Sequence, residues 1–380
     1  MKTRVLLDIT TLGAIHNAGV NPGGIFHATE RLGLALSKRQ DLEIVIAAKK
    51  GQSGNVRKYI KETGNFSECE NVLDKDGLEA QTKFSKPDVL HINWRGIDVF
   101  PDIHSCKVVY DLPDIVAVKR PDYFSTSNSS KTVTEYLKRL IVSCETQSFF
   151  VHTEKVKFDI LRRFGHIREE QIFVLPLGHN SSDLKSAKRE EGIRDEFKIL
   201  CINTVEPRKN MITALKAIER LRKNYLDINF SLTIVGSRGW LSDEVYSFHS
   251  ELPKDLQERI VFTGYISDDE LMNLRRRSHL FLFPSFDEGF GLPIVEALAD
   301  GLDVVISEAA ACREVSLGFA EIVNGNSARQ LSDKIAEMYK RRLSGEQSRS
   351  IDLQLGQYSW ESSAAKHAAA YLNLVSGSAR

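Results

Sequence analysis

Short runs of apolar residues alternate with amphipathic stretches along the whole chain. In the first half these runs predict buried strands at 5–9, 42–47, 89–92, 107–110, 148–152 and 172–176. After a charged stretch at 183–196 the rhythm restarts, with strands predicted at 198–202, 230–235, 259–262, 280–284 and 303–307. Helical periodicity fills the intervals, for example at 26–37 and 210–222. Apolar strands that alternate with helices predict parallel sheets covered on both faces.

Two such series joined by a charged linker predict an α/β protein with two Rossmann-like domains, at 1–180 and 181–360. The length of 380 residues agrees with two domains, because single cores rarely exceed roughly 250–300 residues. Ligands of such sheets bind beyond the carboxyl ends of the strands, so we expect a site in a cleft between the halves. A last predicted helix, at about 361–374, can belong to either half.

Composition narrows the class of protein. Hydrophobic residues make up 42% and charged residues 27% of the chain, which excludes disordered and fibrous classes. Lys+Arg and Asp+Glu both number 51, so no overall field attracts nucleic acid or an acidic membrane. No apolar run approaches the roughly 18 residues of a membrane span, and the run after the basic start is too short for a secretory leader. The five widely spaced cysteines favour a reduced, cytoplasmic compartment.

The most informative stretch follows the predicted strand 280–284. Gly289 and Gly291 allow close approach of a ligand, and Pro293 suits the first turn of a helix, whose free amides bind anions. Glu288 and Glu296 flank these amides, and carboxylates accept hydrogen bonds from hydroxyl groups. Together they predict a ligand with hydroxyls on either side of phosphate, such as a nucleotide sugar. The alternative, in which Glu296 complements the helix dipole and Glu288 caps the helix, stays open.

Basic residues follow the first strand of the second half. Arg208 and Lys209 lie directly after the strand 198–202, where a diphosphate needs cations in a metal-free site. Two solvated basic residues at a helix start remain the alternative. Gly23 and Gly24 follow the first strand of the chain and have the shape of a phosphate loop, although a plain turn explains them better.

These motifs, in this order, resemble glycosyltransferase family 4. The resemblance rests on the spacing of Glu288 and Glu296, the E-P-R-K-N sequence at 206–210, the Gly-Gly loop, and L-P-L-G at 175–178. It covers most of the chain and is densest at 198–323. It implies a GT-B fold, with two Rossmann-like domains facing each other across a cleft. It also implies metal-independent, retaining transfer of a sugar from a nucleotide donor. The last helix, at 361–380, would pack back onto the first domain.

The resemblance also implies roles for individual residues, with Arg208, Lys209 and Glu288 as the catalytic set. Glu288 would hold hydroxyls of the donor sugar, and Glu296 would hold the ribose. Arg208 and Lys209 would neutralise the diphosphate leaving group. The remaining donor-binding residues that it implies are Gly23 and Gly24 at the phosphates, the amides of Phe290, Gly291 and Leu292, and Gly236 and Tyr265 near the base.

Two positions depart from the family's pattern. Tyr110 and Asp111 stand where the family often has His-Asp, and Tyr110 can bond a sugar hydroxyl but cannot act as an imidazole does. Asn203 stands where Gly is common, beside the expected diphosphate. We expect Tyr110, Asp111 and Asn203 to bind the donor, and these departures from the pattern put the sugar preference in doubt.

We therefore expect a hexosyltransferase that needs no metal or other cofactor and binds no nucleic acid. UDP-glucose is the favoured donor and GDP-mannose the next, and the acceptor is a growing oligosaccharide, a polysaccharide or a lipid-linked glycan. A nucleotide-sugar epimerase of the same fold, with Asp111 or His91 as its acid and base, is one alternative. An inactive nucleotide-sugar-binding partner is another, supported by Tyr110.

Other motifs carry weaker predictions. D-x-D at 74–76 matches a metal-diphosphate motif, but a solvated turn explains it better. The basic run 275–277 is expected to form a solvated face, and His91 to lie in the core or at its rim. Basic residues at 57–61 leave peripheral contact with the cytoplasmic face of a membrane open.

Overall fold

The chain forms two compact units in a computed structural model, which describes residues 2–18, 23–48, 51–69, 72–73, 87–93, 106–124, 134, 137–138, 147–179, 195–345 and 355–377. The first unit consists of Met1–Ile115, Arg139–His179 and Gln357–Arg380, and the second of Val116–Lys138 and Asn180–Gly356. Both units are therefore discontinuous in sequence: Gln357–Arg380, which holds the last helix, belongs to the first unit, and Val116–Lys138 belongs to the second.

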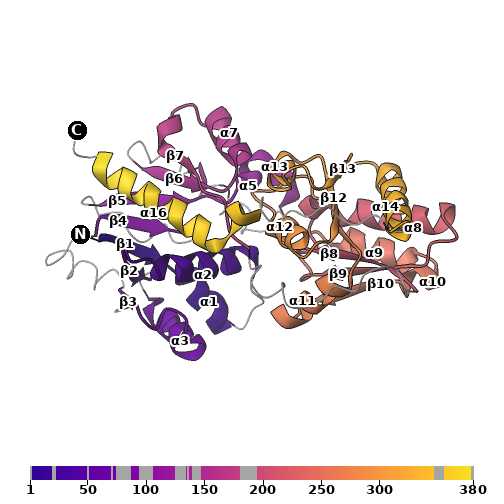
Figure 1. The fold of residues 1–380 in the computed structure, drawn as a ribbon, viewed down its shortest axis with the longest axis horizontal. Coiled ribbons are helices and arrows are strands. Elements are labelled where there is room, and N and C mark those ends of the chain that lie inside the picture. The colour runs from indigo at the N-terminus through magenta and orange to yellow at the C-terminus, as the bar shows by residue number, and fades with distance from the viewer. Residues whose placement is uncertain are drawn as a thin grey trace. The chain divides into compact units, whose positions relative to one another are not determined.

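A seven-stranded parallel sheet organises the first unit, in the order β3-β2-β1-β4-β5-β6-β7 (Figure 1). Its strands are β1 (Thr3–Asp8), β2 (Leu42–Ala47), β3 (Val72–Leu73), β4 (Val89–Ile92), β5 (Lys107–Asp111), β6 (Ser148–Val151) and β7 (Ile172–Val174). The strand order reverses between β1 and β4, and such a reversal is the place where open parallel sheets bind ligands. Gly23 and Gly24 do not follow β1 directly, because a helix at Thr10–Ala18 lies between that strand and Gly23.

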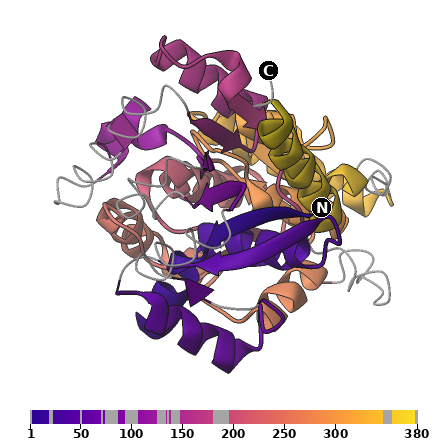
Figure 2. The same cartoon turned by 90° about the vertical axis from the view of Figure 1, so that its left-hand side faces the viewer.

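Helices cover this sheet, and the last helix of the chain is one of them (Figures 1 and 2). The described helices are α1 (Thr10–Ala18), α2 (Gly24–Ser37), α3 (Ser53–Thr63), α7 (Glu154–Arg163) and α16 (Trp360–Ser376). Helix α16 packs beside α2. Its start is pressed against the chain at Gly178, where an added Cβ would lie 2.4 Å from the backbone nitrogen of Trp360. The structure thus places the last helix in the first unit.

The second unit is built on a six-stranded parallel sheet in the order β10-β9-β8-β11-β12-β13. Its strands are β8 (Phe197–Ile202), β9 (Phe230–Val235), β10 (Ile260–Gly264), β11 (Leu280–Phe283), β12 (Asp303–Ser307) and β13 (Glu321–Val323). Its helices of six or more residues are α8 (Met211–Asn224), α9 (Asp243–Glu251), α11 (Asp268–Arg277), α12 (Leu292–Ala299), α13 (Ala310–Val315) and α14 (Ala328–Leu343). The strand order reverses between β8 and β11.

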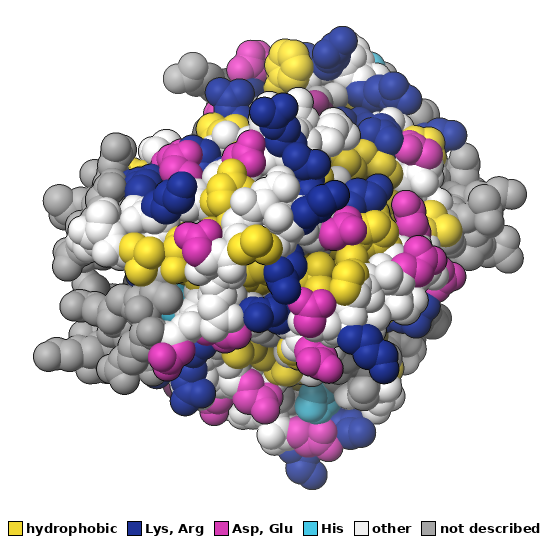
Figure 3. All heavy atoms as spheres, turned by 90° about the vertical axis from the view of Figure 1, so that its right-hand side faces the viewer, with side chains coloured by type: hydrophobic (Ala, Val, Ile, Leu, Met, Phe, Trp, Pro, Cys, Tyr) yellow, Lys and Arg dark blue, Asp and Glu magenta, His cyan; other side chains and the backbone are white. Residues whose placement is uncertain are grey.

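Apolar strands form the core of this unit because helices bury both faces of the sheet. Phe197, Phe230 and Phe281 have no exposed surface. Short segments also join the unit from the other half of the sequence, namely α5 (Val116–Lys119) and the 3-10 turn Pro121–Tyr123. The predicted class, α/β with two parallel sheets, is confirmed. On the face shown in Figure 3, basic and acidic side chains are interspersed, as the balanced composition predicts.

Candidate functional site

The candidate site lies at the carboxyl edge of the second sheet, where the strand order reverses. The loop 203–210 follows β8 and the loop 284–291 follows β11, and these two strands are neighbours in the sheet. The backbone N–H of Phe286 donates to the carbonyl of Arg208 over 2.9 Å, which joins the two loops directly. The two motifs that the sequence singled out, which are far apart along the chain, therefore meet at one place.

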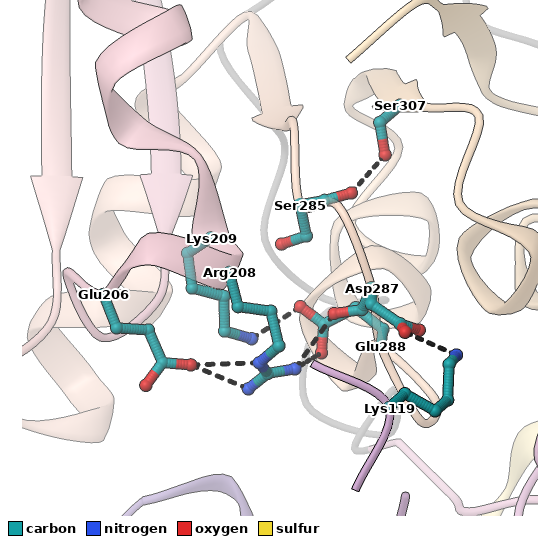
Figure 4. A network of polar contacts seen from close by, with 8 residues as sticks. All are labelled: Lys119, Glu206, Arg208, Lys209, Ser285, Asp287, Glu288 and Ser307. Atoms are coloured by element: carbon teal, nitrogen blue, oxygen red, sulfur yellow. Dashed lines mark hydrogen bonds and ion pairs between the residues drawn. The ribbon is translucent and has the colours of Figure 1, made fainter. Parts of the chain in front are cut away.

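Four charged side chains form the centre of this site (Figure 4). Arg208 Nη1 donates to Glu288 Oε2 over 2.7 Å, and Lys209 Nζ donates to Glu288 Oε1 over 2.6 Å. On its other side, Arg208 Nη2 lies 2.9 Å from Glu206 Oε1. Only 16% of the Arg208 side chain and 13% of the Lys209 side chain are exposed. The alternative of two solvated basic residues is therefore wrong.

The two carboxylates of this cluster differ in their electrostatics. Burial by itself would raise the pKa of Glu288, but the charges of Arg208 and Lys209 outweigh it and lower the pKa to about 2. Burial dominates at Glu206 and raises its pKa, although Arg208 and Lys209 oppose that change. Glu288 is thus firmly ionised, and its two oxygens each accept from a different cation.

Glu288 does not cap α12. The residue at the cap position of this helix is Gly291, with φ of 94°, which has no side chain to cap the helix. Phe290, Gly291 and Leu292 lead into the helix there, with Pro293 in its first turn, as predicted. These amides supply the positive end of a helix next to the cation cluster.

Asn210 ties the site loops together, and the sequence motif gave it no role. Its Nδ2 donates to the carbonyl of Pro284 over 3.0 Å and to the carbonyl of Gly325 over 2.7 Å. One buried amide thereby links the chain after β8 to the chain after β11 and after β13. Asn210 also has φ of 56°, a backbone conformation that asparagine tolerates better than most residues.

A segment from earlier in the chain holds the loop that carries Glu288. Lys119 Nζ lies 2.6 Å from Asp287 Oδ2 (Figure 4). The ring of Tyr123 stacks on Phe286 with centroids 6.2 Å apart, and the ring of Phe124 stacks on Trp240 at 5.5 Å. Sequence reasoning missed these contacts, since nothing in the composition of 116–124 relates it to residues beyond 235.

Glu296 has a buried basic partner. Arg275 Nη1 lies 3.1 Å from Glu296 Oε2, and Arg275 Nε donates to Asp300 Oδ2. The side chain of Arg275 is 11% exposed. The prediction of a solvated face at 275–277 is therefore wrong for its first residue, because α11 brings that residue against α12.

The loops after β8 and β9 touch at Asn203. Gly236, with φ of 138°, lies so close that an added Cβ would be 1.9 Å from the carbonyl oxygen of Asn203. The side-chain oxygen of Asn203 is buried and has no hydrogen-bond partner among the residues that the structure describes. Tyr265 follows β10, the neighbour of β9, and is 38% exposed. Asn203, Gly236 and Tyr265 thus lie at the same edge as the cation cluster.

The remaining predicted residues belong to the first unit. Gly23 precedes the first turn of α2 and Gly24 begins that helix, and an added Cβ at either would meet no atom within 4 Å. Tyr110, at the end of β5, is buried with its ring 6.2 Å from that of Phe149. Gly23, Gly24 and Tyr110 thus belong to a different unit from the cation cluster.

Asp111 has a partner that the sequence did not suggest. His152, after β6, lies with Nε2 3.2 Å from Asp111 Oδ1 and Nδ1 3.0 Å from the carbonyl of Leu175. Burial raises the pKa of Asp111, but His152 outweighs it and the pKa is lowered; conversely, Asp111 outweighs burial at His152, whose pKa is raised. A histidine thus accompanies Asp111 from the neighbouring strand, where the family's pattern expects one at position 110.

His91 belongs to the core. Its side chain has no exposed surface, and its Nδ1 lies 2.7 Å from the Tyr371 hydroxyl of α16. The expectation of a core or rim histidine is confirmed, and His91 cannot serve as the acid or base of an epimerase. The D-x-D motif at 74–76 lies outside the described residues.

No group of three or more His, Cys, Asp and Glu side chains among the residues that the structure describes is arranged to hold a metal ion. None of the helices found there is both long and apolar enough to cross a membrane.

Comparison with solved structures supports the fold. Sucrose-phosphate synthase from Thermosynechococcus elongatus matches 99% of this chain and 100% of its own chain, with a TM-score of 0.72 and 15% identity. Anabaena HepE, solved in complex with UDP-glucose, matches 98% of this chain and 99% of its own, with a TM-score of 0.70 and 15% identity. At such identities the likeness shows the fold alone, which is the GT-B class expected from the sequence.

Comparison with curated proteins identifies relatives. The serotype-specific mannosyltransferase WbdA of Escherichia coli is 26% identical over 290 residues, covering 69% of this chain and 34% of its own. The O-antigen chain mannosyltransferase B of Escherichia coli is 32% identical over 163 residues, covering 43% of this chain and 42% of its own. The chain thus spans about a third of the length of WbdA. A family model described as "Glycosyl transferases group 1" matches residues 184–352. The chain is similar to the glycosyl transferases group 1 over these residues, which hold the cation cluster and both glutamates.

Proposed function

We propose that the protein is a retaining, metal-independent hexosyltransferase that moves a sugar from a nucleotide donor to a glycan or lipid-linked glycan. The observation that supports this proposal most is the ion-pair cluster of Arg208, Lys209 and Glu288 at the point where the strand order reverses. Open parallel sheets bind ligands there. The family of residues 184–352 supports the same reaction class.

In this mechanism the cations stabilise the leaving group. When the bond between the sugar and the diphosphate breaks, negative charge develops on the diphosphate oxygens. Arg208 offers a planar fork of donors and Lys209 a compact charge, and both lie beside the start of α12. Fixed donors of this kind contribute about 3 kcal/mol each to stabilising a transition state.

Glu288 would recognise the transferred sugar. Its carboxylate accepts hydrogen bonds only, so it suits sugar hydroxyls and disfavours phosphate. In the structure its oxygens accept from Arg208 and Lys209. We expect the arriving diphosphate to compete for these cations, while hydroxyls of the sugar become new donors to Glu288.

Retention of configuration would follow from attack on the same face that the diphosphate leaves. The leaving phosphate oxygen takes the proton of the acceptor hydroxyl, the new glycosidic bond forms, and the bond to the diphosphate breaks. No carboxylate nucleophile is required. The anomeric configuration of the product, measured by NMR, tests this part.

The identity of the donor sugar can be tested by comparing candidate donors directly. Sequence alone put UDP-glucose first and GDP-mannose second. Several relatives carry the name mannosyltransferase, and one from Escherichia coli, 26% identical over 189 residues, is named a galactosyltransferase acting from UDP-galactose. We therefore propose a hexose donor and place GDP-mannose beside UDP-glucose in the test.

The experiment is a titration of the full chain with UDP, GDP and ADP, each with EDTA and with magnesium, followed by transfer assays with the matching sugar. We expect one nucleotide to bind equally with and without metal. Lys209→Met should weaken its binding about tenfold or more. Arg222→Met, which removes an exposed guanidinium from α8, serves as the control and should bind like the wild type.

The outcomes separate the alternatives. Conversion of the donor sugar without any acceptor would establish an epimerase instead. Tight binding without transfer to any of a broad set of acceptors would establish a binding protein. Equal affinity of the wild type and Lys209→Met would remove the main support for the proposal.

A further inference from the structure

Three charged side chains on and next to two helices form a second network in the second unit. Arg275 lies in the last turn of α11, while Glu296 is on α12 and Asp300 follows its last residue. Arg275 Nε donates to Asp300 Oδ2, and Arg275 Nη1 donates to Glu296 Oε2 over 3.1 Å. One guanidinium therefore holds two carboxylates at once.

The three side chains of this network differ in their exposed fraction. The side chain of Asp300 is 1% exposed and that of Arg275 11%. The side chain of Glu296 is 27% exposed, which leaves it within reach of a ligand. A buried carboxylate next to a guanidinium fixes that guanidinium firmly, since neither charge can turn to water. Asp300 thus anchors Arg275, and Arg275 in turn presents Glu296.

The charge of the network limits what it binds. Two carboxylates and one guanidinium leave one net negative charge, and the exposed member is an acid. Such a site repels phosphate and accepts hydrogen bonds from hydroxyl groups. Glu296 lies on α12, an eight-residue helix that begins four residues after Glu288 of the cation cluster. A hydroxyl-bearing group next to a diphosphate fits both conditions.

We propose that Arg275, anchored by Asp300, is a positioning residue that orients the Glu296 carboxylate toward ribose hydroxyls of the nucleotide. This inference rests on the proposed function. Without Arg275 the glutamate side chain would sample several rotamers and would lose conformational entropy when the ligand binds. With Arg275 in place, that entropy is already lost before the ligand arrives. Substitution of Arg275 should therefore change the affinity only for nucleotides that carry ribose hydroxyls.

The test compares UDP and GDP with their 2′,3′-dideoxy forms by calorimetry on the full chain. The wild type should bind the ribose form of its nucleotide about tenfold tighter than the dideoxy form, because a hydrogen bond to a charged group discriminates to that extent. Glu296→Gln and Arg275→Met should both reduce this ratio to about two or less. Arg277→Met, on the same turn but exposed, should keep the wild-type ratio.

A variant that preserves the charge covers the case in which Arg275→Met does not fold. Arg275→Lys keeps the positive charge beside Asp300 but lacks the planar fork that reaches both carboxylates. It should fold, bind the dideoxy nucleotide as the wild type does, and lose the preference for ribose. A residue that served stability alone would lower the affinity for both nucleotides equally or for neither.

The results distinguish the inference from the function on which it rests. If Glu296→Gln loses the preference for ribose while Arg275→Met and Arg275→Lys keep it, the positioning role is overturned and the proposed function stands. If the wild type shows no preference for ribose, the inference is overturned while the transfer assay still decides the function. If neither nucleotide binds to the wild type, both are overturned.

Discussion

Gly236 packs directly on the carbonyl of Asn203, with only 1.9 Å between that oxygen and the position of an added Cβ. Its φ of 138° is also unfavourable for any residue with a side chain. We predict that Gly236→Ala lowers the free energy of unfolding by about 3 kcal/mol and weakens nucleotide binding, because the loops after β8 and β9 must separate. Denaturant unfolding and a nucleotide titration measure both effects.

A glycine in open surroundings provides the matched control for that substitution. Gly54 lies in α3, and an added Cβ there would meet nothing within 4 Å. Gly54→Ala should be neutral or slightly stabilising, since alanine restricts the unfolded chain. Equal stability of the two variants would show that the contact between Gly236 and Asn203 can relax.

Acid should remove the stabilisation that Glu288 provides. Its pKa is lowered from 4.5 to about 2, so the ionised form stabilises the fold above pH 4.5, and this contribution is lost as the pH falls toward 2. At pH 7 the shift corresponds to about 3 kcal/mol. Glu288→Gln should therefore be less stable than the wild type at pH 7, and the difference should shrink below pH 4.5. A difference that is constant with pH would contradict the ion-pair origin.

Two buried histidines should also lower the stability as the pH falls, but they should do so at a higher pH than Glu288 does. Burial lowers the pKa of His91 to about 4 and that of His367 to about 3. The unfolded chain therefore binds protons that the folded chain excludes, and stability should fall as the pH drops from about 6.5 toward 4. Asp111 raises both pKa values and His152 lowers them, and the measured slope of unfolding free energy against pH includes both effects.

His367→Leu isolates one of these two groups. The slope of unfolding free energy between pH 6.5 and 5 should decrease by about 1 kcal/mol per pH unit, because one proton fewer distinguishes the two states. His166→Gln, which removes an exposed imidazole of the same unit, serves as the control. Identical slopes for the wild type and His367→Leu would mean that His367 stays accessible to protons in the folded chain.

Lys119 should act on the site through Asp287, the residue before Glu288. Their charged atoms are 2.6 Å apart, with 26% of the lysine and 13% of the aspartate side chain exposed. We predict that Lys119→Met weakens nucleotide binding about fivefold, the equivalent of about 1 kcal/mol for a partly exposed ion pair. Lys223→Met, on the exposed side of α8, is the control. An unchanged dissociation constant would show that the loop 284–291 keeps its position without this lysine.

The strands were largely predictable because buried parallel strands are continuous apolar runs. The predictions at 42–47, 89–92, 230–235 and 303–307 match β2, β4, β9 and β12 at both ends. Strands β3 and β13 were missed, and β3 has only two residues, which cannot establish a periodicity. The motif residues were also predictable, because glycines, a proline and charged side chains directly after strands mark the edge where ligands bind.

The partners of those residues were not predictable from the sequence. Arg208 and Glu288 are 80 positions apart, and only the adjacency of β8 and β11 brings them together. Arg275 stands in a basic run whose other members resemble a solvated face, and its role depends on how α11 packs against α12. Asp111 finds His152 through the pairing of β5 with β6. Each of these contacts depends on the order of strands in a sheet, which local patterns do not encode.

The discontinuity of the units has a consequence for synthesis on the ribosome. The core of the first unit includes Tyr371, which bonds His91 across 280 positions. The strands β1 to β7 are all synthesised before α16. In the nascent chain the apolar surface that α16 covers therefore stays exposed while the second sheet is made. The second unit requires nothing after Gly356 and can complete first. The half of the protein that begins the chain is therefore the half that finishes folding last.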